Sequence, residues 1–105
     1  MTIRIAIPSQ AKVGEIIEIR TLIQHPMETG FRRDEYGRAI PRDILERFSC
    51  LYNGEIVFEA TLFPAVTANP YLTFCTRATE SGTLVFRWTD QRGEVFEETA
   101  DLEVV

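Results

Sequence analysis

Residues 48–63 read FSCLYNGEIVFEATLF. Asn53-Gly54, in the middle of this stretch, is the strongest hairpin signal in the chain, because both residues tolerate the positive φ angles of a type I′ turn. On either side of the turn, apolar residues recur at every second position, as in half-buried strands. The stretch therefore predicts two antiparallel strands, over 48–52 and 55–63, joined by a tight turn.

The same alternation continues outward from this hairpin and predicts five more strands, over residues 2–8, 15–23, 71–78, 83–89 and 94–105. The strand over 15–23 is apolar on one face and partly apolar on the other, which favours a central position in its sheet. In the last strand Glu98 interrupts the apolar face, so we expect a bulge or a register shift there. Together the strands predict an all-β fold, an immunoglobulin-like antiparallel β-sandwich of about seven strands, in a single domain spanning residues 1–105.

One long polar segment interrupts the strand pattern after the second strand, over residues 24–42 (QHPMETGFRRDEYGRAIPR). Loops longer than about 12–15 residues are uncommon in compact domains and usually have a function or are disordered. A turn signal over 34–37 predicts a small hairpin with arms at 31–33 and 38–40. Residues 41–47 could form one helical turn, because a proline suits its first position. The sequence thus predicts a long, decorated loop.

The composition excludes several classes of function. The net charge of −5 over 105 residues argues against nucleic-acid binding, which needs clustered basic residues. No apolar run approaches the length of a membrane span. The opening MTIRIAIPSQ lacks the basic and apolar regions of a signal peptide, which taken alone favours the cytoplasm. Export together with a partner that carries a signal stays open.

The residues indicate no catalytic, cofactor or metal site. His25 is the single histidine, and no nucleophile-elbow motif accompanies it. A loop histidine that hydrogen-bonds to backbone is the simpler interpretation. His25 and Met27 with a cysteine could suit copper, but the chain lacks a second histidine and clustered cysteines. Met27 is therefore expected to pack in the interior.

The two cysteines leave three interpretations open. Cys50 shares a face with Phe48 and Tyr52 and is expected to be a small buried hydrophobe. Cys75 is most simply a buried, inert cysteine as well, but Arg77 lies on its face and could activate its thiol for a redox function. A Cys50–Cys75 disulfide is a third possibility, since sequence does not give the distance between the two residues.

Two polar segments are candidates for recognition. The arginines of the interruption alternate with acids, so each is best explained as solvated and paired locally, but as a group they could bind an anion or a partner. The segment TANPY (67–71) is either the start of a strand or a recognition tip. The candidate interface residues are His25, Met27, Arg32, Arg33, Arg38, Arg42, Asn69 and Tyr71.

A series of motifs along the chain resembles the SoxZ family, in the same order and from Lys12 to about Glu103. The motifs are HPMETG (25–30), RRD (32–34), IPRDILERFSC (40–50), YNGE (52–55), TANPY (67–71) and ATESGTLVFRWTDQRGEVF (78–96). HPMETG followed by IPRDI and ANPY is the distinctive part, because the strand segments alone would not be specific.

This resemblance implies an immunoglobulin-like, non-catalytic subunit of the SoxYZ complex of bacterial sulfur oxidation. The partner SoxY carries sulfur intermediates of thiosulfate on a cysteine near the end of a flexible C-terminal tail. The chain would pair with SoxY as a heterodimer or larger complex and help dock that tail to the pathway enzymes. The family also implies a periplasmic location reached by co-export. Cys50 matches a family position and Cys75 does not, and neither is assigned the carrier function.

Three alternatives accompany this hypothesis. The chain could be a stand-alone module that binds a sulfur oxyanion, or a thiol-based redox protein using Cys75. The isolated chain could also self-associate through an exposed apolar face.

Overall fold

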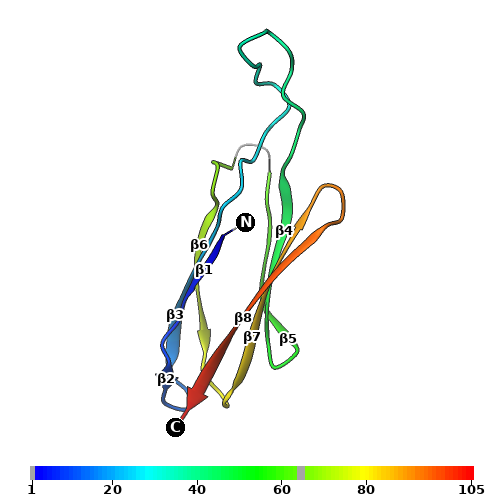
Figure 1. The fold of residues 1–105 in the computed structure, drawn as a ribbon. Coiled ribbons are helices and arrows are strands. Elements are labelled where there is room, and N and C mark those ends of the chain that lie inside the picture. Colours follow the sequence, from blue (N-terminus) through cyan, green and yellow to red (C-terminus); the bar gives the residue numbers. More distant parts are fainter. Residues whose placement is uncertain (1, 64–65) are drawn as a thin grey trace.

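The computed structural model describes residues 2–63 and 66–105. These residues form eight strands: β1 (Ile3–Ala6), β2 (Gln10–Ala11), β3 (Ile16–Ile23), β4 (Leu45–Tyr52), β5 (Glu55–Thr61), β6 (Tyr71–Arg77), β7 (Gly82–Asp90) and β8 (Val95–Val104). They make a three-stranded sheet, β1-β3-β6, and a five-stranded sheet, β2-β8-β7-β4-β5, packed face to face (Figure 1). The predicted immunoglobulin-like sandwich is confirmed.

The hairpin at Asn53-Gly54 forms as predicted. Both residues have positive φ, 50° and 86°, as a type I′ turn requires. Asn53 also fixes the turn to the start of β7, because its side-chain Oδ1 accepts a hydrogen bond from Thr83 N at 3.1 Å and its own N–H donates to Thr83 O at 3.0 Å. Asn53 therefore fixes both the reversal of the chain and the contact between this turn and β7.

The core lies between the two sheets and is built from the alternating apolar residues. Phe48, Phe86 and Trp88 have no exposed surface, and the rings of Phe48 and Trp88 lie 4.9 Å apart between centroids. β3 is the central strand of its sheet, as its sequence predicted, and buries Ile17 and Ile19 against this aromatic layer.

The predicted helical turn over residues 41–47 is wrong. The backbones of Glu28 and Asp43 exchange two hydrogen bonds, of 2.7 and 2.8 Å, which hold the segment extended. The next two residues, Ile44 and Leu45, are both buried, and β4 begins at Leu45. Pairing with residue 28 and burial in the core thus override the local preference for a helix start.

Two strand predictions at the ends of the chain also need correction. β1 stops at Ala6, and residues 10–11 cross to the other sheet, where they pair in parallel with Glu103 and Val104. No bulge occurs at Glu98, since β7 and β8 keep one register throughout. β2 pairs with β8 only at residues 103 and 104, so β8 has no neighbour on that side at Glu98. Glu98 therefore lies at an open edge of the sheet and is exposed. Register shifts occur instead where β4 pairs with its two neighbours. Opposite Cys50 and Leu51 the extra residue is Val57 of β5, and opposite β7 the shift lies between Leu45 and Arg47.

The residues between β3 and β4 extend beyond the end of the sandwich (Figure 1). We call residues 28–43 the projecting loop. The molecule measures 58 × 20 × 20 Å along its principal axes, with a radius of gyration of 16.1 Å over Cα atoms. A compact chain of this length would have a radius of about 13 Å. The projecting loop therefore makes an otherwise small sandwich elongated.

Candidate functional site

The projecting loop is a narrow hairpin closed at its neck. The Glu28–Asp43 bridge forms the neck, and a second bridge joins Arg33 to Ala39. Gly30 follows the neck with a φ of +92°, and an added Cβ would lie 3.3 Å from the Cβ of Arg42. Glycine thus permits both the backbone conformation and the close approach of the two arms.

Asp34 organises the tip of this hairpin. Its Oδ1 accepts hydrogen bonds from the backbone N–H groups of Tyr36 and Arg38, each at 2.9 Å. These bonds, the one from the Arg38 backbone foremost, outweigh desolvation and lower the pKa of Asp34 below its ordinary value. The hairpin predicted around residues 34–37 is confirmed, with Ile40 N bonded to Arg32 O at 2.8 Å.

Two arginines of the projecting loop are paired within it, as expected for each one singly. Arg32 Nε donates to Glu28 Oε2 at 3.2 Å, and this hydrogen bond lowers the pKa of Glu28. Arg38 Nε donates to Asp34 Oδ2 at 3.1 Å, and its guanidinium lies 5.1 Å from the centroid of the Tyr36 ring. Both guanidinium groups stay open to partners, since the two side chains are 65% and 72% exposed.

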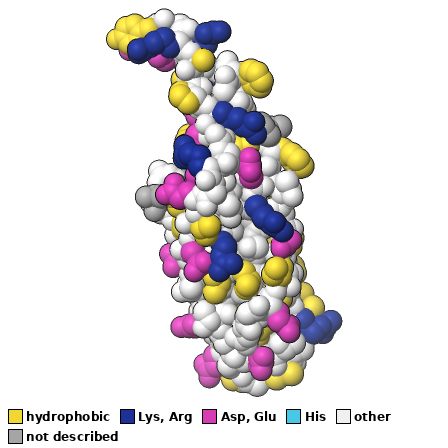
Figure 2. All heavy atoms as spheres, turned by 90° about the vertical axis from the view of Figure 1, so that its right-hand side faces the viewer, with side chains coloured by type: hydrophobic (Ala, Val, Ile, Leu, Met, Phe, Trp, Pro, Cys, Tyr) yellow, Lys and Arg dark blue, Asp and Glu magenta, His cyan; other side chains and the backbone are white. Residues whose placement is uncertain are grey.

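The tip combines these cations with exposed aromatic side chains. Phe31 is 90% exposed and Tyr36 is 74% exposed. Figure 2 shows hydrophobic and basic side chains together at the end of the projecting loop, away from the sandwich. Large, unburied aromatic residues beside arginines are typical of surfaces that bind another protein.

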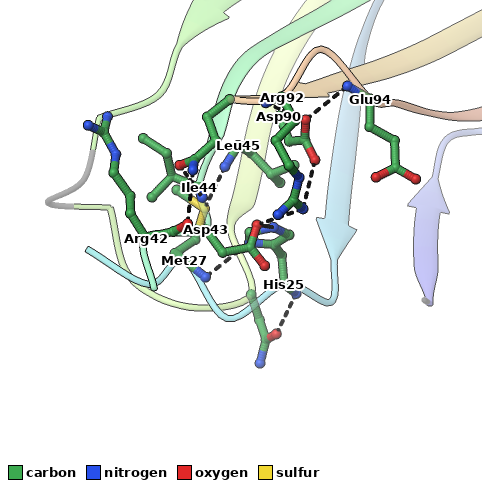
Figure 3. A network of polar contacts seen from close by, with 11 residues as sticks. His25, Met27, Arg42, Asp43, Ile44, Leu45, Asp90, Arg92 and Glu94 are labelled. Atoms are coloured by element: carbon green, nitrogen blue, oxygen red, sulfur yellow. Dashed lines mark hydrogen bonds and ion pairs between the residues drawn. The ribbon is translucent and has the colours of Figure 1, made fainter. Parts of the chain in front are cut away.

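The base of the projecting loop is held by His25 and Met27, which are buried rather than surface residues. Met27 N donates to His25 Nδ1 at 3.0 Å, and Leu45 N donates to the Met27 sulfur at 3.3 Å (Figure 3). His25 N donates to Asn69 Oδ1 at 2.9 Å, while Asn69 N donates to His25 O at 2.7 Å. The expectation that His25 hydrogen-bonds to backbone and that Met27 packs inside is confirmed.

A polar network joins this base to the turn between β7 and β8. His25 Nε2 lies 3.4 Å from Asp43 Oδ1, and Arg92 Nη2 lies 3.3 Å from that oxygen and 3.2 Å from Asp90 Oδ2 (Figure 3). Gln91 also bonds the turn to the C-terminal end of the loop, since its side chain accepts a hydrogen bond from Ile44 N at 3.2 Å and donates one to Arg42 O at 2.9 Å. The base of the loop is therefore bonded to two distant segments of the chain, at Asn69 and at the turn between β7 and β8.

Asp90 is the buried carboxylate of this network, only 2% exposed. Burial alone would raise its pKa, but hydrogen bonds from Glu94 N at 2.9 Å and Arg92 N at 2.8 Å, with the Arg92 guanidinium, hold that pKa below its ordinary value. The sequence predicted a turn here but not the network. The sequence signal that could have pointed to this network is an aspartate at the end of an apolar strand, directly before a turn.

The structure separates the predicted interface residues into three places. Arg32, Arg33 and Arg38 lie on the projecting loop, and Arg42 lines a hollow of about 480 Å³ with Phe63 and Arg47. His25 and Met27 lie beneath the surface. Their use in partner binding stays a prediction.

Asn69 and Tyr71 mark a third place, on the outer side of the three-stranded sheet. Asn69 lines a hollow of about 380 Å³ and Tyr71 an adjoining one of about 280 Å³, and both hollows are lined by Arg4 and Leu22. Tyr71 is 58% exposed, so it does not cap the core. Sequence reasoning did not select Arg4, because a single arginine in a strand carries no motif.

The cysteines lie in opposite environments, and both are free, so the disulfide interpretation is wrong. Cys50 points into the core, and burial raises the pKa of its thiol to about 12. Cys75 is exposed on the outer face of the three-stranded sheet, so the expectation that it is buried is wrong. Among residues 2–63 and 66–105, no three His, Cys, Asp or Glu side chains are placed to hold a metal. Nor does that part of the chain contain a helix that could cross a membrane.

Comparison with known proteins identifies one family. The model of the family described as "Sulphur oxidation protein SoxZ" matches residues 3–101 of this chain. A comparison with curated proteins gave no match.

Solved structures with the same fold have low sequence identity to this chain. A superoxide reductase (neelaredoxin) from Ignicoccus hospitalis has a TM-score of 0.73 at 16% identity, covering 100% of this chain and 81% of that one. The sulfur carrier protein SoxY from Chlorobium limicola f thiosulfatophilum has a TM-score of 0.69 at 15% identity, covering 98% and 78%. A CARDB domain from Pyrococcus furiosus scores 0.58 at 18% identity, covering 99% and 86%. At these identities the likeness concerns the fold alone.

Proposed function

This chain belongs to the SoxZ family of sulphur oxidation proteins, and we therefore propose that it is the scaffold subunit of a sulfur-carrier complex. In this proposal it pairs with a SoxY-type subunit whose C-terminal cysteine carries the sulfur intermediates. It performs no chemistry itself and helps present that cysteine to the enzymes of the pathway. A solved SoxY has the same sandwich fold as this chain.

The observation that carries the proposal is the construction of the projecting loop. His25 and Met27 at its base are buried, and the base is bonded to two distant segments, whereas its tip exposes Phe31, Tyr36 and the arginines. Exposed aromatic side chains have an unfavourable contact with water, which binding to a partner would relieve. A rigid base also reduces the entropy that such binding would cost. These features support a recognition element for SoxY, its cysteine-bearing tail, or the enzymes that act on that tail.

The tip can be tested without disturbing the fold. We expect the double variant F31A/Y36A to weaken complex formation with SoxY, or thiosulfate turnover with the pathway enzymes, by at least about tenfold, as for aromatic hot-spot residues. V13A is the control, since Val13 is also an exposed apolar residue, at 69%, but lies outside the projecting loop and the hollow beside Arg42. Melting temperatures should stay unchanged in both variants. If the double variant, and also deletion of residues 31–38, left every complex and the turnover unchanged, the loop would not be the recognition element.

We also propose that the chain functions in the periplasm and is exported together with its partner. This location is an expectation that comes from the resemblance of the sequence to the SoxZ family. Cell fractionation tests it: the chain should reach the periplasm only when a partner with an export signal is co-expressed. Export of this chain in the absence of any partner would contradict co-export.

A second candidate function is direct binding of a small sulfur oxyanion. The adjoining hollows beside Asn69 and Tyr71 favour it, because both are lined by Arg4, which has no ion pair among the described residues. Guanidinium groups suit oxyanions because they donate several hydrogen bonds in one plane. Calorimetry of the isolated chain with thiosulfate tests this candidate. Heat of binding that is lost in R4Q would support it, and an absence of heat would exclude it.

A further inference from the structure

The two sheets of the sandwich do not match in width. Five strands face three, and β6 is the last strand of the narrower sheet. The Phe74 ring of β6 packs 4.4 Å from the Phe58 ring of β5 and 5.9 Å from the Phe48 ring of β4. β6 therefore lies across the boundary of β4 and β5. Beyond β6, no described strand covers the inner side of β5. Val57, the extra residue at the register shift, and Phe58 both pack against the core there and remain only half-buried.

The backbone of β6 is paired on one side only. Two hydrogen bonds just outside β6 show which of its residues bond to β3. Ile23 N donates to Pro70 O at 3.3 Å, and Ala78 N donates to Glu15 O at 2.8 Å. Bonded pairs alternate along an antiparallel ladder, so Leu72, Phe74 and Thr76 direct their backbone groups toward β3. The remaining residues direct their N–H and C=O groups to the open edge, where the described chain supplies no partner. They are Tyr71, Thr73, Cys75 and Arg77.

Other edges of the sandwich are protected in ways that β6 is not. β1 has four residues and β2 two, and β5 carries Glu55 and Glu59 beside a register shift. The part of β8 that β2 leaves unpaired carries Glu97, Glu98 and Asp101. Short strands, charges and bulges are the usual means of preventing strand addition. β6 has seven residues in an unbroken register, no proline, no acidic residue and one charge, Arg77, at its end.

The space beside this edge is open. A hollow of about 320 Å³ lies between the sheets, lined by Val57 and Glu55 from β5, Thr76 and Arg77 from β6, and by Tyr52, Asn53, Thr79 and Glu80. Adjacent strands lie about 4.8 Å apart, so one more strand beside β6 would lie over Val57 and Phe58. An added strand would thus provide hydrogen-bond partners for the unpaired N–H and C=O groups of β6 and would also cover the half-buried side chains of β5.

We propose that the open edge of β6 binds an extended segment of the SoxY-type partner as an added β-strand, with apolar residues at every second position facing Val57 and Phe58. This inference rests on the proposed function. The edge strand of a second sandwich fits beside β6 less well than a single segment does. Because β5 extends past β6, it would collide with the sheet that packs against that edge strand in the second domain. A single flexible segment has no such sheet. Strand addition of this type gives affinity through main-chain bonds and specificity through alternate side chains.

Amide hydrogen exchange in the complex of this chain with the SoxY-type subunit tests the proposal. In the isolated chain the N–H groups of Thr73 and Cys75 should exchange freely, and in the complex at least about tenfold more slowly, because a bonded amide must open before it exchanges. The amides of Phe74 and Thr76, which bond to β3, should be protected in both states and serve as the internal reference.

Two variants test the same edge independently. T73P removes an outward N–H without removing a bond to β3, and should weaken the complex at least about tenfold, whereas T73V keeps that N–H and should bind normally. V57K places a charge beneath the added strand and should weaken binding by a similar factor even if T73P does not fold.

The outcomes separate this inference from the proposed function. If the complex forms while the amides of Thr73 and Cys75 exchange as in the isolated chain, strand addition at β6 is wrong and the proposed function stands. If these amides become protected in the isolated chain as its concentration rises, the occupant is a second copy and the inference is overturned. If no complex forms, the proposed function fails and this inference fails with it.

Discussion

Cys50 and Cys75 have environments that should give them very different reactivity. Burial raises the pKa of the Cys50 thiol to about 12, so almost none of the reactive thiolate exists at neutral pH, and the core also excludes reagents. Cys75 is exposed. We expect a thiol reagent at pH 8 to label one cysteine in the folded chain and a second after denaturation. Loss of the first label in C75S would assign it. Two equal labels in the folded chain would contradict the buried position of Cys50.

Asp90 is the residue on which the base network depends most. Its carboxylate accepts from two backbone N–H groups, and D90A would leave these donors without that acceptor. We expect D90A to reduce the free energy of unfolding by about 1–3 kcal/mol, the usual range for the loss of hydrogen bonds to a buried charged group. D101A is the matched control, because Asp101 is exposed and bonds only to Thr83 among the described side chains.

The pH dependence of this effect has a definite sign. The folded state lowers the pKa of Asp90, so the stabilisation is present above the unfolded pKa of about 3.9 and is lost as the pH falls through the lower folded value. Thermal melts of wild type and D90A should therefore differ by a constant amount between about pH 8 and 5, and approach each other in stronger acid. A difference that grew with acid would contradict the lowered pKa.

At the scale of elements, the neck of the projecting loop depends on Gly30. Gly30 and Gly37 both have positive φ, 92° and 77°, so alanine is strained at either position, by about 1–2 kcal/mol. Only at Gly30 would the new Cβ also meet a neighbour, 3.3 Å away on Arg42. We expect G30A to lower the melting temperature more than G37A. Equal losses would mean that the neck is loose enough to absorb the methyl group.

The strands were largely predictable from sequence, and the ends of the projecting loop were not. Asn53-Gly54 and the alternation around it fix a hairpin locally, because turn and strands need only neighbouring residues. The extended segment at residues 41–47 depends on pairing with Glu28 and on burial of Ile44 and Leu45, which no local pattern contains. The network of His25, Asp43 and Arg92 likewise joins three distant segments.

The open edge of β6 was equally invisible in the sequence. The alternation of residues 71–78 predicts a strand but not its neighbours, and the strand order follows from packing of the whole chain. The exposure of Cys75 was not predicted either, because the alternation shows that it shares a face with Tyr71 and Thr73 but not which face lies against the core. The position of Cys75 beside an unpaired edge was equally absent from the local pattern.

The whole molecule has an elongated shape that scattering can test. Because the projecting loop is fixed at its base and extends from the sandwich, we expect a radius of gyration of about 16 Å in solution, from the 16.1 Å of the Cα atoms. Deletion of residues 31–38 should reduce it toward the value of about 13 Å for a compact chain. A full-length value near the compact one would mean that the loop folds back onto the sandwich.

The central claim is that this chain works as one half of a complex, and co-expression with a SoxY-type subunit tests it most directly. Size-exclusion chromatography with light scattering should give a single species whose mass equals that of the partner plus the 12.0 kDa of this chain. In that case the carrier chemistry lies on the partner and the projecting loop and the edge of β6 become its candidate contacts. If this chain instead elutes alone, at its own mass, in the presence of the partner, the scaffold function proposed for it is contradicted.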